Sequence, residues 1–207
     1  MLPANAKIVK CPFCGERKEL LNLASGNTFG AKRWSDQKMI APMLPQVSPV
    51  QKCPACGKYY LEYNQPYEEG DDWSSERGDL SYQEWKEAYG HLKSDKSITK
   101  NDLQTVRFHL IHAFNDNFCR QSATSIPAGE EDYFVGVIHD YIDNCSWNKK
   151  NMLFKAELYR EAGEMKKCEE VLSKISFENL RDFESKIYKE IEERMKKNDK
   201  KVFLIKI

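Results

Sequence analysis

The residues best suited to chemistry in this chain are four cysteines arranged as two close pairs. Cys11 and Cys14 form the first pair, Cys53 and Cys56 form the second, and both pairs have the form Cys-Pro-x-Cys-Gly. Two intervening residues let one tight turn aim both sulfur atoms at the same metal ion. Proline can preset such a turn, and the glycine that follows can adopt the positive φ that the turn often needs. We therefore predict that these four side chains bind one metal ion.

The identity and role of the metal follow from this set of four sulfur ligands. Four thiolates bind Zn²⁺ tetrahedrally and leave no open coordination position, so the metal is expected to be structural and not to activate water. Iron binds to similar knuckles and remains an alternative to zinc. A redox dithiol and a pair of disulfides are further alternatives, but a redox C-x-x-C motif normally opens a helix in a βαβ context, which neither pair does.

The two knuckles resemble those of zinc ribbons, and this similarity covers about residues 9–63. It implies a small β-rich domain, and the aromatic, roughly alternating segment 58–63 is predicted to be a strand that leaves the second knuckle. The segments 25–30, 34–36 and 41–45 resemble a group of bacterial proteins that join such a ribbon to a helical region. That resemblance implies no activity.

The long insertion between the two pairs contains a second candidate for binding. Trp34 lies there among the basic residues Lys32, Arg33 and Lys38. An aromatic ring with basic neighbours can stack on a nucleic-acid base or hold a peptide. The simpler interpretation is that Trp34 and Met43 cover a small ribbon that has almost no core of its own.

Charge is balanced over the whole chain but uneven along it. The 207 residues include 32 basic and 32 acidic side chains, so no global field attracts the chain to nucleic acid or anionic lipid. Residues 1–62 carry nine basic and four acidic side chains, whereas residues 63–95 carry three basic and nine acidic ones. We therefore predict three parts, which are a zinc ribbon over 1–63, an acidic linker over 64–80 and a helical domain over 81–207.

Hydropathy and cysteine usage indicate the cellular compartment of the protein. No window reaches the ~20 apolar residues of a membrane span, and the first residues lack the apolar core of a secretory signal. Paired cysteines in a reducing compartment suit metal binding better than a disulfide framework. We expect a cytoplasmic protein without a membrane partner.

A helical period follows the acidic segment. Thr99 can cap a helix that places Leu103, Val106 and Leu110 on one stripe. The predicted helices cover residues 81–93, 99–118, 131–144, 149–162, 164–175 and 177–197. The apolar, β-branched tail 202–207 predicts a final strand. The expected class is α+β, with a small N-terminal β-rich ribbon followed by an α-helical hairpin domain.

The predicted helix pair over 149–175 resembles one tetratricopeptide repeat. Its small and large residues alternate as in that family, and they are Ala156, Tyr159, Gly163, Cys168 and Leu172. The chain departs from the family pattern at Met152, where a bulky aromatic residue is usual, and it contains about one repeat of the usual three or more. Stacked hairpins of this kind commonly bind a protein or peptide. A compact bundle without a partner is the alternative interpretation.

Three histidines and three further cysteines are the remaining reactive side chains of interest. His109 and His112 lie three residues apart on one predicted helix, and His139 on a later helix could approach them. These histidines could form a second metal site or an acid–base pair. Because no carboxylate lies at helical spacing to orient them, contacts at the surface or between helices are the simpler interpretation. The other cysteines are expected to be small buried residues, and they are Cys119, Cys145 and Cys168.

Two functional hypotheses follow, and a third possibility, an enzyme that uses His109, His112 and His139, would require these residues to converge in a pocket. The chain contains no nucleotide-binding, zinc-protease or serine-hydrolase motif. The first hypothesis is a structural zinc protein that acts as an interaction module or adaptor through its helical hairpins. The alternative is a nucleic-acid-binding zinc ribbon that uses the loop around Trp34.

Overall fold

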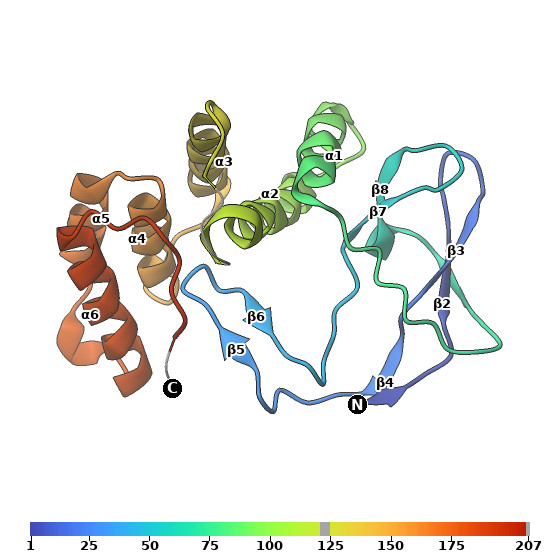
Figure 1. Cartoon of the computed structure of the whole chain (residues 1–207), viewed down its shortest axis with the longest axis horizontal. Coiled ribbons are helices and arrows are strands. Elements are labelled where there is room, and N and C mark those ends of the chain that lie inside the picture. Colours follow the sequence, from blue (N-terminus) through green and yellow to red (C-terminus); the bar gives the residue numbers. More distant parts are fainter. Residues whose placement is uncertain (121–124, 206–207) are drawn as a thin grey trace. The chain divides into compact units, whose positions relative to one another are not determined.

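The computed structural model describes residues 1–120 and 125–205, which form two compact units. The first unit comprises residues 1–31 and 40–110, and the second comprises residues 32–39 and the described residues from 111 onward. Short strands occupy the N-terminal third, and six α-helices follow among the described residues (Figure 1). This order agrees with the predicted α+β class. The three-part division that composition predicts stays a prediction.

Two antiparallel hairpins organise the first unit. β2 pairs with β3, and β7 pairs with β8, so each hairpin loop carries one cysteine pair. β9 adds to the other edge of β2, and β1 pairs with β4. The strands of this unit are β1 (Leu2–Pro3), β2 (Lys7–Lys10), β3 (Arg17–Leu20), β4 (Leu23–Ser25), β7 (Val50–Lys52), β8 (Tyr59–Leu61) and β9 (Tyr67–Glu69).

A small apolar cluster lies between the two hairpins. Val9 and Leu20 come from the first hairpin, Tyr60 comes from the second, and Cys11 and Cys53 complete the cluster. All five side chains are buried. The predicted strand over 58–63 is confirmed over β8, after which residues 62–64 form a turn of 3₁₀ helix. The core of this region is small, so a crosslink between the hairpins would contribute much of its stability.

One helix and most of a second complete the first unit, and local capping explains where they begin. α1 (Tyr82–Ser94) starts after Ser81, whose hydroxyl accepts a hydrogen bond from the backbone of Glu84 while the Glu84 carboxylate accepts one from the backbone of Ser81. This reciprocal pair is a capping box. α2 (Lys100–Phe114) begins in the same way, with Thr99 and Asp102 as the pair, so the predicted cap at Thr99 is confirmed.

The first unit also contains polar contacts between its strands and helices. The Tyr59 hydroxyl donates to Glu87 at 2.7 Å, and the Tyr63 hydroxyl donates to Asp102 at 2.8 Å. Lys52 forms an ion pair with Glu84 at 3.1 Å. The strands that carry the second cysteine pair are therefore fixed to α1 and α2.

The second unit is mainly helical. Its core contains Ala156, Cys168, Val171, Leu172, Ile191 and Phe203. After α2, residues Asn115–Cys119 continue as a π-helical turn, so the chain is helical over almost all of the range predicted as 99–118. The remaining helices lie within the predicted ranges or one residue outside them, and they are α3 (Glu130–Asn144), α4 (Met152–Glu161), α5 (Met165–Leu172) and α6 (Asp182–Lys196).

A glycine sets the sharp turn between α4 and α5. Gly163 has φ +77°, and its N–H donates to the carbonyl oxygen of Arg160 at 3.0 Å. The N–H of Glu164 donates to the carbonyl oxygen of Tyr159 at 2.8 Å. These two bonds form a Schellman motif, which satisfies the last carbonyl groups of α4. The predicted hairpin therefore exists, although its likeness to a tetratricopeptide repeat stays a prediction.

The C-terminal segment lies along the loop that contains Trp34. Leu204 forms an isolated antiparallel bridge with Trp34, and Ser35 donates a backbone hydrogen bond to Phe203 at 2.9 Å. The N–H of Ile205 donates to Arg33 at 2.8 Å. The strand predicted over 202–207 is thus represented by a single bridge, and its last two residues lie outside the described part of the chain.

None of the helices within residues 1–120 and 125–205 is both long enough and apolar enough to cross a membrane.

Candidate metal centre

The two cysteine knuckles have nearly the same backbone geometry. In the first, the N–H of Gly15 donates to the carbonyl oxygen of Cys11 at 2.9 Å, and in the second Gly57 donates to Cys53 at the same distance. Gly15 has φ +78° and Gly57 has φ +70°, as the Cys-Pro-x-Cys-Gly pattern predicts. A side chain with a Cβ is strained at such angles. Each glycine therefore lets its loop turn back toward the strand that follows.

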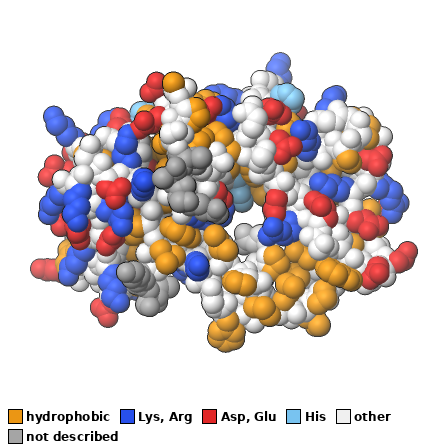
Figure 2. Space-filling view, in the orientation of Figure 1, with side chains coloured by type: hydrophobic (Ala, Val, Ile, Leu, Met, Phe, Trp, Pro, Cys, Tyr) orange, Lys and Arg blue, Asp and Glu red, His pale blue; other side chains and the backbone are white. Residues whose placement is uncertain are grey.

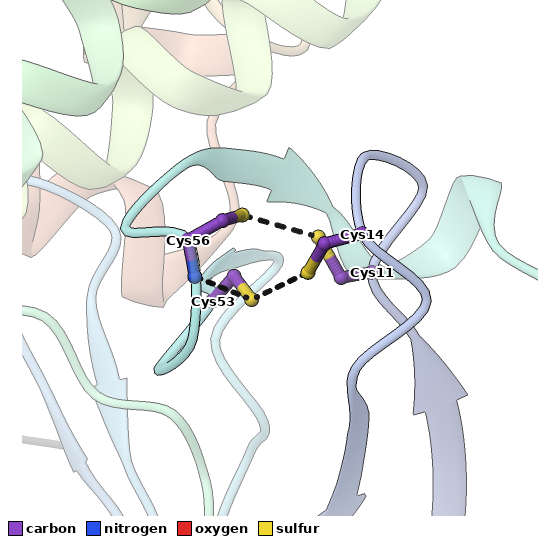
Figure 3. Close-up of side chains that lie close together, drawn as sticks. All are labelled: Cys11, Cys14, Cys53 and Cys56. Atoms are coloured by element: carbon purple, nitrogen blue, oxygen red, sulfur yellow. Dashed lines mark hydrogen bonds between the residues drawn. The ribbon is translucent and has the colours of Figure 1, made fainter.

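The hairpins bring the four sulfur atoms together. All four lie within 4.8 Å of one another (Figure 3). The Sγ atoms of Cys11 and Cys56 are 3.7 Å apart, and those of Cys14 and Cys53 are 3.5 Å apart. A disulfide requires a separation of about 2.05 Å, so these cysteines are free thiols. Sulfur atoms at the corners of a tetrahedron around zinc, each ~2.3 Å from the metal, are about 3.8 Å apart. The cluster therefore could hold a metal ion.

Burial divides the four thiols into two kinds. Cys11 and Cys53 are buried in the apolar cluster, whereas Cys14 and Cys56 are exposed. Burial acts to raise the pKa of Cys53, but hydrogen bonds from the backbone of Cys56 and Ala55 outweigh it and lower that pKa to about 7. Backbone N–H groups that stabilise a thiolate in this way also favour metal binding.

The remaining donors near the cluster add no fifth ligand. Among the described residues, the four cysteines form the one group of histidine, cysteine and carboxylate side chains close enough to share an ion. Burial, together with the nearby thiols of Cys11 and Cys53, raises the pKa of Tyr60 to about 12, so its hydroxyl stays protonated. The arrangement fits a closed four-sulfur site.

Other residues pack against Trp34, the second candidate for binding. The guanidinium of Arg120 lies 4.7 Å from the centre of the indole ring. The ring is half-buried, and its Nε1 atom is buried without a hydrogen-bond partner. Trp34 belongs to the second unit, so it packs against Arg120 and the C-terminal segment. The hypothesis of an exposed ring that stacks on a base gains no support.

The three histidines have separate neighbours. His109 stacks on Trp85 with the ring centres 5.4 Å apart. The Nε2 atom of His112 lies 2.9 Å from the carbonyl oxygen of Asp36, and burial lowers the pKa of His112. His139 lies 3.0 Å from Glu164. Each of the three rings therefore contacts another segment of the chain, and their role in a site stays untested.

The three other cysteines differ in burial. Cys168 is fully buried in the helical core, as predicted, whereas Cys119 and Cys145 are half-buried. Burial raises the pKa of Cys168 to about 12 and that of Cys119 to about 11, so both are neutral thiols near pH 7.

Sequence reasoning missed a buried polar cluster in the second unit. Asp36 forms an ion pair with Arg120, and both side chains are almost fully buried. The side-chain amide of Asn115 donates to Asp36 at 3.1 Å and to Glu161 at 2.8 Å. These residues are far apart in the sequence and follow no motif.

Comparisons with known proteins add no relative. No model of a protein family, no curated protein and no solved structure matches the chain.

Proposed function

We propose that the protein is a structural zinc protein whose Cys11, Cys14, Cys53 and Cys56 thiolates hold one Zn²⁺ ion. The observation that carries this proposal is the separation of the sulfur atoms, all within 4.8 Å of one another. The sulfur distances of 3.5 Å and 3.7 Å are close to those of a tetrahedral four-thiolate site. A closed shell of this kind leaves no position for a substrate, so the ion stabilises the fold.

Native mass spectrometry with metal analysis tests this function. The purified chain is expected to carry one zinc ion, and Cys53→Ser is expected to release it and unfold the first unit. Structural zinc contributes on the order of 10 kcal/mol of apparent binding free energy, more than a small domain can lose. Cys145→Ser is the matched control, because Cys145 is a half-buried thiol outside the cluster. A Cys53→Ser protein that keeps its zinc and its fold would refute the assignment.

We further propose that the helices of the second unit act as a protein-interaction module. The support is the packing of α4 against α5, where the small residues Ala156 and Cys168 are fully buried and let the helices approach closely. Basic and acidic side chains are intermixed on the exposed surface of α5 and α6 (Figure 2), with ion pairs such as Lys196–Glu192 at 3.2 Å. Charged side chains of both signs can pair with complementary charges on a partner, which contributes to specificity more than to affinity.

Crosslinking of the full chain in an extract of its own cells tests the module. A protein or peptide crosslinked through Lys166, Lys189 or Lys196, on α5 and α6, is expected. Glu192→Lys reverses a charge on the same surface while keeping all three amines, and it should weaken this crosslink. Crosslinks confined to the first unit would count against the proposal. The alternative, a nucleic-acid-binding ribbon, stays a prediction, and the absence of binding at low ionic strength would remove it, because phosphate contacts are strongest there.

A further inference from the structure

Three segments of the first unit contain no charged side chain. They are residues 1–6, 20–31 and 40–51, and none of them contains Asp, Glu, Lys, Arg or His. Charged residues make up 31% of the whole chain, so uncharged segments of this length depart from its composition. We refer to the surface that these three segments form as the uncharged face.

Backbone contacts join the three segments to one another. β1, from the first segment, pairs with β4, from the second. The N–H of Ala4 donates to the carbonyl oxygen of Asn22 at 3.1 Å, and the N–H of Asn27 donates to the carbonyl oxygen of Met43 at 3.2 Å. Figure 2 shows hydrophobic side chains gathered over the part of the first unit that holds the N-terminus and β4. The three segments therefore form one continuous surface.

Large apolar side chains of the uncharged face are exposed to water. Phe29 is 82% exposed and Leu2 is 59% exposed, while Ile40 and Met43 are 43% and 40% exposed. The backbone at Phe29 is ordered, because its N–H donates to the side chain of Asn27 at 3.0 Å. An exposed apolar patch of this kind marks an interaction site in a folded protein.

The absence of charge indicates which kind of partner fits this face. Anionic lipid and nucleic acid are attracted by lysine and arginine side chains, which the three segments lack. A highly charged protein surface would lose the hydration of its charges there without gaining opposite charges. The uncharged face is therefore complementary to another uncharged, apolar surface.

A second copy of the chain offers such a surface. In a two-fold dimer the same patch of each copy meets the other, so the patch has to be complementary to itself. A patch of one charge sign repels its copy, whereas an uncharged patch does not. The cores of homodimer interfaces are likewise apolar and depleted in charged residues.

The size of the uncharged face also suits a dimer. A standard interface takes about 20–30 residues from each partner. Most residues of the three segments are exposed or half-buried, and together they match that size. The face is therefore large enough to form a stable dimer by itself.

We propose that the uncharged face is the contact surface of a two-fold dimer of this chain. The Phe29 ring of each copy packs against the uncharged face of the other, and Leu2, Ile40 and Met43 surround it. This dimer adds an interaction to the zinc site and the helical module, and it requires no partner of the module.

Sedimentation equilibrium of the full, zinc-loaded chain tests the proposal. The mass is expected to rise from the chain mass of 24.2 kDa toward twice that value as the protein concentration increases. Phe29→Asp places a carboxylate in the contact and is expected to raise the dimer Kd about tenfold or more. Tyr67→Asp is the matched control, because Tyr67 is an exposed aromatic residue of the same unit outside the three segments, and it should leave the Kd unchanged.

Photocrosslinking locates the contact without disrupting it. A benzophenone amino acid is placed at position 29 in a mixture of unlabelled and nitrogen-15-labelled chains. Crosslinks between a light and a heavy chain are expected, and they should end within residues 1–6, 20–31 or 40–51. This measurement also decides the question if Phe29→Asp fails to fold.

Four outcomes would overturn the proposal. A chain that stays monomeric at millimolar concentration would show that the face does not bind its copy. Crosslinks confined to single chains would assign the face to a contact within the chain, and crosslinks that end outside the three segments would place the dimer contact elsewhere. A monomer that cosediments with phosphatidylcholine vesicles, and loses this binding in Phe29→Asp, would assign the face to lipid.

Discussion

Glu161 and Cys53 are both ionisable groups held in buried surroundings, but their neighbours act on them in opposite directions. Backbone N–H groups lower the pKa of Cys53 to about 7, which favours the thiolate. Burial and neighbouring carboxylates raise the pKa of Glu161. The same fold therefore favours the charged form of Cys53 and the neutral form of Glu161.

The raised pKa of Glu161 predicts how stability depends on pH. A carboxyl group whose pKa is higher in the folded state binds more protons there, so its contribution lowers the free energy of unfolding as pH rises above its ordinary value of 4.5. Glu161→Gln removes this loss. The variant is expected to gain stability over the unchanged protein as pH rises from 4.5, by up to about 1.4 kcal/mol per pH unit until Glu161 ionises in the folded state.

Urea unfolding of both proteins at several pH values, with zinc held constant, measures this difference. A difference that does not change with pH would show that Glu161 titrates normally in the folded protein.

The spacing of the four cysteines predicted that they form one metal site, but no spacing predicted the buried polar cluster. The cysteines follow a local pattern in which each pair is set by one turn and its glycine. Asp36, Asn115 and Glu161 meet only because α4 and the loop after β5 (Lys32–Arg33) fold against the π-helical turn. No local pattern records such a contact, so the sequence alone could not reveal it.

The helices were predictable because their caps and apolar stripes are local. The capping boxes at Ser81 and Thr99 confirm two predicted starts. The predicted helix over 99–118 is helical over almost its whole length, but the backbone changes from α-helix to a π-helical turn at Asn115, whose side chain is buried in the polar cluster. The apolar period predicted the extent of the helix and not this change in its winding.

The turn between α4 and α5 can be tested by substitution of its glycine. Gly163→Ala places a Cβ at φ +77° and is expected to destabilise the chain by about 1 kcal/mol. Gly136→Ala is the matched control, because Gly136 lies in the interior of α3, is exposed and has open space around it. Alanine there is expected to stabilise the helix by roughly 0.5–1 kcal/mol. Equal effects of the two substitutions in urea unfolding would contradict the assigned turn.

At the scale of the whole molecule, the two units have separate sources of stability. The apolar cluster of the first unit includes Cys11 and Cys53, whereas the helical core of the second unit contains none of the four clustered cysteines. Removal of zinc should therefore affect the units unequally.

Hydrogen exchange after chelation measures this difference. A zinc chelator is expected to increase amide exchange in β2, β3, β7 and β8 while α4, α5 and α6 keep most of their protection. The same chelator should have no further effect on Cys53→Ser. An equal rise in α4, α5 and α6 would show that the metal supports the whole chain and not the first unit alone.

The central claim is that one zinc ion is bound by four sulfur atoms, and X-ray absorption at the zinc edge tests it most directly. The purified chain should show four sulfur neighbours at ~2.3 Å and no nitrogen or oxygen neighbour. A shell that contains nitrogen or oxygen, or a protein that carries no zinc, would contradict the account.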